Sequence, residues 1–418
     1  LRSRQTLSCE NRGRHPISAE YCSRKAQPPG NRVASPGFRL QQGPRTLIFE
    51  AGWTRKINLV RRHFSLIAAA PHLLAAMALA FATPAVICRP AEKNRVESHE
   101  FALMRMGTIF RIVLYGPSRD AASRAAMAAF DRIERLEDIL SDYREHSELR
   151  RLCRNGPGAA RNVSPELFFV LDNSLRISRL SGGAFDVTIG PLSSLWREAR
   201  KLKRLPDPAA VRQARESVGY ENIILDEASR TVTLVLPDMR IDLGGIAKGY
   251  AAEQALAVLK SRGFPSALVD AGGDISIGAA PPGKTGWQIA IRDPGRATHE
   301  PPGYLVLSDL AIATSGDEFQ HLDLYGRRYS HIINPADGMG VTDAANVTVI
   351  ARDGTTADAL ATALSIMPAA EGIRLIESIE GASAAIVRRA GNGFERILSL
   401  RFPRPVTMDP RPAGRSTS

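Results

Sequence analysis

The sequence predicts an α+β, or mixed α/β, fold in which strands and helices interleave within one intertwined body. Several short apolar segments alternate with a period of two residues, and others repeat at spacings of three and four. The two kinds follow one another without strict βαβ alternation, which favours mixed sheets with flanking helices. At 418 residues with 44% hydrophobic content, the chain can bury one large core or two modest ones.

Residues 1–54 are expected to be an upstream extension outside this fold, because they are rich in Arg, Pro, Gly and Ser and show no sustained period. Residues 55–88 have the three parts of an export signal: basic residues, an apolar run from Leu66 to Ala82, and small residues after it. The pair Arg61-Arg62 resembles a twin-arginine signal. A general secretory signal and an uncleaved membrane anchor are the alternatives. We therefore expect the body at 89–418 to be exported, to the periplasm or the outer face of a bacterial inner membrane.

The net charge of +12 comes mostly from this leader, since residues 1–88 hold 13 Lys and Arg against 3 Glu and no Asp. The rest of the chain is close to neutral and carries no basic stripe, which excludes nucleic acid as a partner. Cys153 is the one cysteine beyond residue 88. The body therefore has no disulfide framework and no cysteine pair with zinc spacing.

The elements of the body follow from local patterns in chain order. Alternation predicts a strand over 101–115 that ends at Gly116-Pro117, and an amphipathic repeat predicts a helix over 121–140. Ser164 and Pro165 are typical of a helix start, and that helix should reach residue 180 before Ser181-Gly182-Gly183. A hairpin is expected from 220–225 and 231–236. Further strands are expected at 266–269, 287–291, 305–307, 329–333, 346–350 and 384–387, and further helices near 249–261, 357–367 and 369–379.

Residues 241–275 predict a phosphate site at one end of a β-α-β unit. Gly244 and Gly245 let the backbone approach a ligand closely, the helix start after them aims free N–H groups at an anion, and Lys248 adds a cation in the first helical turn. The segment lacks both the P-loop and the dinucleotide-binding glycine patterns, which excludes a generic NTPase or dehydrogenase. The plain alternative is an ordinary glycine turn between a strand and a helix.

A second candidate site lies at the start of the helix near 357, where Thr356 is the expected N-cap and Asp358 falls in the first turn. Asp358 and Thr362 are four residues apart and share a face. A carboxylate, a hydroxyl and a backbone carbonyl from elsewhere would make a hard oxygen site for a small divalent cation that keeps phosphate ligands. The alternative is that Asp358 only interacts with the helix dipole.

His331 ends a short strand that runs into a Pro335-x-Asp337-Gly338 turn. A histidine there is either a structural hydrogen-bonding residue or, beside a metal–phosphate site, a base for an attacking hydroxyl. Three further segments pair a polar loop with an aromatic or acidic residue: Thr314 to Asp317, Ser141-Asp142-Tyr143, and Gly183 to Asp186.

Taken together and in this order, these segments resemble the ApbE family, flavin transferases that move FMN from FAD onto a threonine of another protein. The resemblance runs from about Met104 to Ile379 and implies an ApbE-like fold with the catalytic domain at 89–418. It rests on six ordered motifs: Met106-Gly-Thr108; Ser141-Asp-Tyr143 with Ser147-Glu-Leu149; Gly183 to Leu192 with Trp196; Asp242 to Gly249; Ala271-Gly-Gly-Asp274; and His331 to Gly338 followed by Asp358 to Thr362. The sequence departs from the family pattern at Cys153, where Asn is expected, and at Phe319, where Tyr is usual.

The resemblance also implies roles for single residues. FAD would be the substrate, contacted by Met106, Tyr143, Ala184, Phe185, Asp186, Asp242, Lys248 and Ile332. Mg²⁺ would be held by the Gly245 carbonyl, Asp358, Thr362 and the Ala361 carbonyl, together with the FAD pyrophosphate. His331 stands at the position of the catalytic base, with Asp358 essential through the metal.

The implied partner is an acceptor flavoprotein subunit that carries the target threonine, from a respiratory or electron-transfer system. Two other functions fit the same residues. With water as the nucleophile the site would be a Mg²⁺-dependent FAD pyrophosphatase giving FMN and AMP. Without transfer chemistry the chain would be an exported flavin-binding protein.

Overall fold

The computed structural model describes residues 38–43, 46–51, 96–291, 303–316, 320–391 and 393–407. The chain divides into two compact units, 1–67 and 68–418. In the first unit, β1 (Phe38–Gly43) and β2 (Thr46–Ala51) form an antiparallel hairpin within the segment expected to be an extension. The export segment at 55–88 lies outside the described residues. Among the helices that are described, none is both long and apolar enough to cross a membrane.

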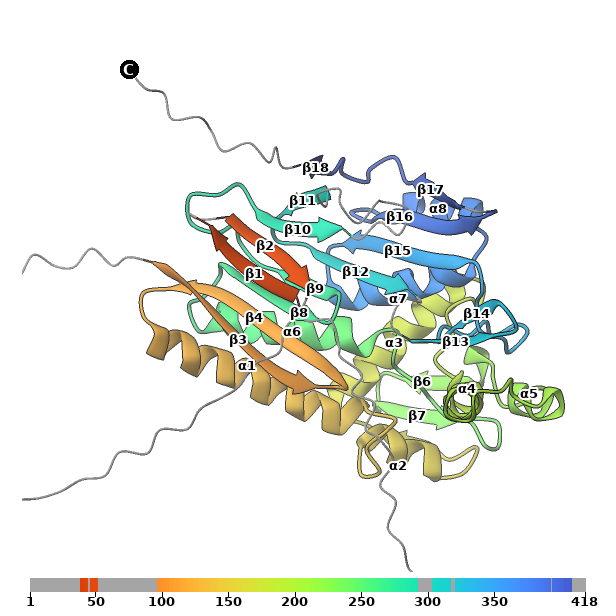
Figure 1. The fold of residues 1–418 in the computed structure, drawn as a ribbon. Coiled ribbons are helices and arrows are strands. Elements are labelled where there is room, and N and C mark those ends of the chain that lie inside the picture. The colour runs from red at the N-terminus through yellow and green to blue at the C-terminus, as the bar shows by residue number, and fades with distance from the viewer. Residues whose placement is uncertain are drawn as a thin grey trace, which may run out of the picture. The chain divides into compact units, whose positions relative to one another are not determined.

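The second unit is built on one large antiparallel sheet (Figure 1). Its strands in chain order are β3 (Glu97–Arg105), β4 (Thr108–Gly116), β8 (Ala267–Ala271), β9 (Asp274–Ile277), β12 (Ala311–Gly316), β15 (Ala344–Ala351), β16 (Ser383–Ala390) and β17 (Gly393–Leu398). They lie side by side in the order β17-β16-β15-β12-β9-β8-β4-β3. Every neighbouring pair is antiparallel. Short hairpins join three of the seven pairs, β3–β4, β8–β9 and β16–β17, and other elements lie between the two strands of the remaining four pairs. The α+β class is confirmed, with antiparallel sheets in place of the expected mixed ones.

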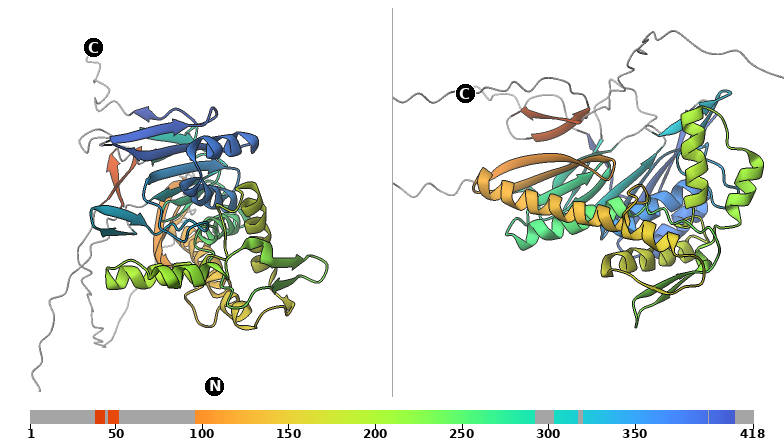
Figure 2. Two further views of the ribbon diagram at one scale, coloured as in Figure 1. Left: turned by 90° about the vertical axis from the view of Figure 1, so that its right-hand side faces the viewer. Right: turned by 90° about the horizontal axis from the view of Figure 1, so that it is seen from below.

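Helices cover one face of this sheet (Figure 2). Those that pack on it directly are α1 (Arg119–Leu140), α6 (Ala247–Ser261), α7 (Gly354–Ile366) and α8 (Ala369–Ser378), and α3 (Pro165–Leu180) packs against α1 and α7. The other face packs against a small sheet of β10 (Trp287–Ile291), β11 (Gly303–Leu307) and β18 (Val406–Thr407). Val113 and Leu268 of the large sheet meet Trp287 and Leu305 of the small one in a second apolar cluster.

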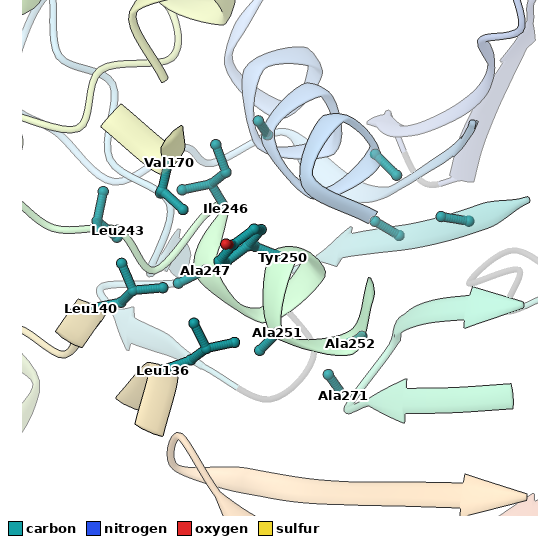
Figure 3. Close-up of a cluster of buried hydrophobic side chains, with 14 of the residues drawn as sticks. Leu136, Leu140, Val170, Leu243, Ile246, Ala247, Tyr250, Ala251, Ala252 and Ala271 are labelled. Carbon is teal, nitrogen blue, oxygen red and sulfur yellow. The ribbon is translucent and has the colours of Figure 1, made fainter. Parts of the chain in front are cut away.

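Helix α6 is the centre of the main core. Figure 3 shows its Tyr250, Ala251 and Ala252 within the cluster, with Leu136 and Leu140 of α1 on one side. Ala251, Ala252 and Ala255 of α6 are fully buried, and small side chains let neighbouring elements approach its backbone closely. This packing fixes the position of the residues at the start of α6.

The remaining elements surround this core. They are α2 (Glu148–Arg154), α4 (Gly190–Leu202), α5 (Pro208–Arg215), a 3₁₀ turn (Tyr220–Asn222), the sheet of β5 (Arg161–Asn162), β7 (Thr231–Leu234) and β6 (Ile223–Asp226), and the hairpin of β13 (His321–Leu324) and β14 (Arg327–Ser330). Trp196 of α4 is fully buried in a third cluster that includes Leu322 and Ile333. Its indole N–H donates to the Gly338 carbonyl at 2.8 Å, so α4 is tied to the turn after His331.

Several sequence predictions need correction. The single strand over 101–115 is a hairpin, because Met106 and Gly107 form a two-residue turn with φ of +47° and +72°. Thr314 to Gly316 belong to β12 and not to a turn, residues 331–333 lie beyond β14, and residues 220–222 form a 3₁₀ turn in place of the first hairpin strand. The chain before α6 forms no β-α-β unit, since residues 241–246 are outside any strand.

Candidate functional site

The glycine-containing turns of the β3–β4 and β8–β9 hairpins meet at one end of these strands of the large sheet. Gly272, at φ +76°, lies so close to the Met106 turn that a Cβ on it would be 2.4 Å from Thr108 Oγ1. Asp270 holds this second turn by accepting the Gly273 N–H at 2.9 Å. Only glycine fits position 272, where both the space and the backbone conformation exclude a side chain. Asp274, the first residue of β9, is placed by this turn.

Lys248 connects Asp274 with Asp358. Its ammonium donates to Asp274 and lies 3.8 Å from Asp358 Oδ2, and both carboxylates are almost fully buried. The Gly249 amide donates to the same Asp358 oxygen at 3.0 Å, so both polar contacts of Asp358 within the described chain use Oδ2. Two buried carboxylates face one ammonium, which leaves the cluster short of positive charge.

The electrostatics of this cluster follow from burial and like charge. Burial and the neighbouring Asp274 raise the pKa of Asp358 to about 7, against the opposing effect of Lys248. For Lys248, burial disfavours the charged form, but Asp274 and Asp358 outweigh it and raise the pKa of the ammonium. Lys248 is therefore a permanent cation, and Asp358 is the group whose ionisation a further cation would favour.

The glycine bend and α7 come together as the sequence analysis expects. A Cβ on Gly245 would lie 2.8 Å from Thr362 Oγ1 and 3.3 Å from Phe185 Cε2. In a regular helix the Gly249 amide would donate to the Gly245 carbonyl, but here it donates to Asp358. The Gly245 backbone, Thr362 and Asp358 thus gather at one place and offer a carbonyl, a hydroxyl and a carboxylate.

The sequence predicts free N–H groups at the start of α6, and this prediction is wrong for two residues. Ala247 donates to the Leu243 carbonyl at 2.9 Å, and Gly249 is taken by Asp358. The start of α7 also differs, because its N-cap is Asp353, which accepts the Thr356 N–H at 2.7 Å. Asp358 therefore lies in the second turn, where interaction with the helix dipole is weak. The helix dipole therefore does not explain why Asp358 is buried beside Lys248, and this favours a role for Asp358 as a metal ligand.

Ala361 is fully buried on α7, and its carbonyl accepts the Ser365 hydroxyl at 2.8 Å. This oxygen already has a partner on its own helix, and its role as a metal ligand stays a prediction. Among the residues that the structure describes, no group of three or more His, Cys, Asp and Glu side chains could hold a metal ion. A cation at this place would depend on hydroxyl, backbone and substrate oxygens.

His331 follows β14 and is held by one carbonyl. Its amide and its ring Nδ1 both donate to the Gln320 carbonyl, each at 3.1 Å. Because a carbonyl only accepts, the proton is on Nδ1 and Nε2 keeps its lone pair. Burial, with Lys248 and Arg200 acting in the same direction, lowers the pKa of His331 to about 4 against the opposing effect of the bond to Gln320. The imidazole is therefore a neutral acceptor that feels the charges of the Lys248 cluster.

The other residues predicted to contact the flavin differ in how many of their groups already have partners within the protein. Ile332 is buried, and its amide and carbonyl are bonded to Ser330 Oγ and the Val341 amide. Both carboxylate oxygens of Asp186 already accept hydrogen bonds from within the protein: Oδ1 from the amide and hydroxyl of Thr188, and Oδ2 from the Tyr220 amide. It holds the turn before α4 in shape. Phe185 is buried against the Gly245 bend, and Ala184 is half-buried against the core.

Tyr143 and Asp242 are joined by a residue that the sequence analysis missed. Arg197 of α4 donates to Asp242 at 2.7 Å and to Asp142 at 2.5 Å, and its guanidinium carbon lies 4.1 Å from the centre of the Tyr143 ring. Tyr143 is nevertheless 72% exposed. The predicted site residues also do not include Asp274, the partner of Lys248, although its Gly-Gly-Asp turn is one of the six motifs. Asp317 and Phe319 lie outside the described residues.

Comparison with known proteins decides the family. A model described as the ApbE family matches residues 106–387. This chain belongs to the ApbE family. The family resemblance drawn from six short motifs is thereby confirmed, and so is the ApbE-like fold.

Relatives of this ApbE family member carry one name. It is 32% identical over 301 residues to the FAD:protein FMN transferase of Vibrio cholerae, covering 71% of this chain and 89% of that one. It is 30% identical to the FAD:protein FMN transferase of Treponema pallidum, over 74% and 92% of the two chains. Among solved structures, it superposes on the flavin transferase ApbE of Vibrio cholerae with a TM-score of 0.66 and 29% identity, covering 73% of this chain and 98% of that one. The apo flavinyl transferase ApbE of Pseudomonas stutzeri gives 0.65 and 28%, with 73% and 95% covered.

Proposed function

We propose that this protein transfers FMN from FAD to a threonine hydroxyl of an acceptor protein and releases AMP. Its family and its relatives, named FAD:protein FMN transferase, support flavin transfer to a protein. The structural observation that carries the proposal is the convergence of Lys248, Asp358, Thr362 and the Gly245 bend at the start of α6. This is a cation-lined glycine bend with hard oxygen donors beside it, which suits a pyrophosphate.

The residues present fit Mg²⁺. The Lys248 cluster holds two buried carboxylates against one ammonium, and Thr362 and the Gly245 backbone add neutral oxygen donors. Asp358, Thr362 and the Gly245 carbonyl would hold the ion. When bound, Mg²⁺ supplies charge neutralisation at the oxygens of the FAD pyrophosphate. This ligand set needs oxygens from the substrate to be complete, which ties metal binding to FAD binding.

The chain's own residues provide positioning and proton transfer. Lys248 places a fixed positive charge at the first turn of α6, where it would face the phosphates. His331 offers Nε2 as the acceptor for the proton of the attacking hydroxyl. A bond forms between that oxygen and the FMN-side phosphorus, the bond from this phosphorus to the bridging oxygen breaks, and AMP leaves. Phosphoryl transfer needs mainly this alignment and charge stabilisation.

The deciding experiment incubates the full chain with FAD and Mg²⁺, with and without a candidate acceptor flavoprotein subunit. We expect flavin fluorescence on the acceptor in a denaturing gel, AMP in equal amount, and loss of both with a chelator or with an acceptor whose target threonine is replaced by Ala. AMP and FMN without labelled protein would make the chain a pyrophosphatase. Intact FAD after long incubation with metal and acceptor would make it a flavin-binding protein.

We also propose that the protein acts outside the cytoplasm on a respiratory or electron-transfer flavoprotein. The basis for export is the pair Arg61-Arg62 before the apolar run from Leu66, and the class of acceptor is what the family resemblance implies. Replacing both arginines by Lys should keep the protein in the cytoplasmic fraction of cells. Export of that double variant would favour the general secretory route, and recovery in the membrane fraction would favour an anchor.

A further inference from the structure

One arginine joins three segments that surround the candidate site. Arg197 lies on α4, Asp142 lies in the loop that follows α1, and Asp242 opens the bend before α6. The guanidinium donates through Nη1 to Asp142 and through Nη2 to Asp242, at 2.5 and 2.7 Å. The side chain of Arg197 is 22% exposed, and the two carboxylates are 11% and 12% exposed. Such a bridge between two partly buried carboxylates is rigid, because the guanidinium is planar and both of its ends are used.

The same guanidinium fixes an exposed aromatic ring. It lies 4.1 Å from the centre of the Tyr143 ring, within the range of a cation–π contact. The backbone of Tyr143 is held separately, by a bond from its amide to Ser141 Oγ at 3.2 Å. With 72% of the residue exposed, most of the ring stays open to a ligand. Arg197 therefore restrains the ring of Tyr143, and Ser141 restrains the backbone of Tyr143.

Asp242 carries the effect of Arg197 to the glycine bend. While Oδ2 accepts from Arg197, Oδ1 accepts the Gly244 N–H at 2.9 Å. The next residue is Gly245, which contacts Thr362 and Phe185. A single guanidinium thus braces both the aromatic ring and the bend that would face the pyrophosphate.

We propose that Arg197 is a positioning residue of the FAD site, which holds Tyr143 as a stacking surface for a flat aromatic ring of the ligand and braces the bend through Asp242. The inference rests on the proposed function, because it takes FAD as the ligand. Either the flavin or the adenine ring has the required chemistry, and binding experiments with FMN and with ADP distinguish them. Arg197 acts through the ring and the bend, and bond breaking does not involve it.

The first experiment separates geometry from charge. Arg197→Lys keeps the positive charge, but an ammonium cannot bridge both carboxylates and stack on the ring. We expect its Kd and KM for FAD to rise about tenfold, the size of one lost aromatic stacking contact, with kcat changed less than about twofold. Arg132→Met is the matched control, because Arg132 is 19% exposed and also pairs with two partners, Glu166 and Gln254. It should lower thermal stability and leave Kd for FAD unchanged.

A double-mutant cycle tests the route through the ring. Tyr143→Ala alone should weaken FAD binding by about tenfold. The double variant with Arg197→Lys should bind FAD less weakly than the product of the two single effects predicts. The Tyr143→Ala variant should lose affinity for whichever of FMN or ADP carries the stacked ring and keep its affinity for the other. Binding is measured by fluorescence titration without acceptor, so the cycle is readable whatever the transfer assay gives.

Three results would overturn the inference. These are an Arg197→Lys variant that binds FAD as the unchanged protein does, single effects that multiply fully in the double variant, or a fall in kcat with KM unchanged. Failure of the unchanged protein to bind FAD would instead refute the proposed function. Thermal unfolding of each variant shows whether it is folded, and Tyr143→Ala, an exposed position, keeps the test available if Arg197→Lys is unstable.

Discussion

Gly249 of α6 and Gly354 of α7 meet so closely that a Cβ on Gly249 would lie 2.1 Å from the Gly354 carbonyl oxygen. The reverse is also true, since a Cβ on Gly354 would be 2.3 Å from the Gly249 carbonyl oxygen. This crossing brings the start of α6 against α7. It explains how Lys248 comes within 3.8 Å of Asp358, although the two motifs are far apart in sequence.

The Gly249→Ala variant should therefore be unstable and should lose the site. The added methyl group would meet the Gly354 carbonyl and, at 2.7 Å, the Cβ of Asp358. It forces the helices apart, which costs about 1–3 kcal/mol of unfolding free energy. Separation of the helices also breaks the bond from the Gly249 amide to Asp358. Urea unfolding and an FAD titration measure the two effects.

Gly393→Ala is the control for that variant. Gly393 begins β17, and the nearest atom to a Cβ there is 4.0 Å away. It should change the unfolding free energy by less than about 0.5 kcal/mol and leave FAD binding intact. Equal stability of the two variants would show that α6 and α7 are not in this close contact in solution.

Local signals in the sequence predicted some elements well. Helix α3 begins at Pro165 and ends at Leu180 as expected, because Ser164 caps it and a glycine pair follows it. The start of α7 was placed three residues late, since both Asp353 and Thr356 can cap a helix. The β3–β4 hairpin was missed because alternation continues through a turn in which Met106, an unusual residue at positive φ, takes the first position.

The assembly of the site depended on long-range contacts that no local pattern contains. Gly245 and Thr362 were brought together in the sequence analysis only by the ordered series of family motifs, and the structure places them in contact. Arg197 was missed because its partners come from two separate segments and no motif includes it. Residues that act through pairing partners distant in sequence need coordinates to be found.

Asp358→Asn tests the metal ligand with little change in shape. The amide oxygen can still accept the Gly249 N–H, so the crossing of α6 and α7 should persist. The loss of one negative charge weakens the binding of the cation. The loss of several kcal/mol of transition-state stabilisation then lowers transfer by about a hundredfold or more. Transfer is measured across a Mg²⁺ titration. Full activity at the same Mg²⁺ concentration would remove Asp358 from the metal site.

His331→Asn should slow transfer and keep FAD binding. Loss of a general base lowers the rate by about 10²–10⁴-fold, and the neutral Asn leaves the phosphate region unchanged. Because burial lowers the pKa of His331 to about 4, the imidazole is unprotonated from pH 5 upward. The acid limb of kcat/KM that belongs to His331 should then lie near pH 4 and vanish in the variant. Weakened FAD binding with a normal rate would make His331 a binding residue.

Asp142→Asn tests whether burial or the Arg197 guanidinium has the larger effect on the pKa of Asp142. Burial, followed by Asp242, raises the pKa of Asp142 from 3.8 to about 6, with Arg197 opposing. Between these two pH values the folded chain holds a proton that the unfolded chain has lost. Unfolding free energy should therefore fall with rising pH, by at most about 1.4 kcal/mol per pH unit.

The Asn variant lacks this titration, so the difference in unfolding free energy between it and the unchanged protein should vary between pH 4 and 6 and level off above. Urea unfolding at pH 4, 5, 6 and 7 measures it, with both proteins in the same buffers. Parallel curves would mean that Asp142 has the same pKa folded and unfolded. A difference of the opposite sign would mean that the Arg197 guanidinium, and not burial, decides the charge of this carboxylate.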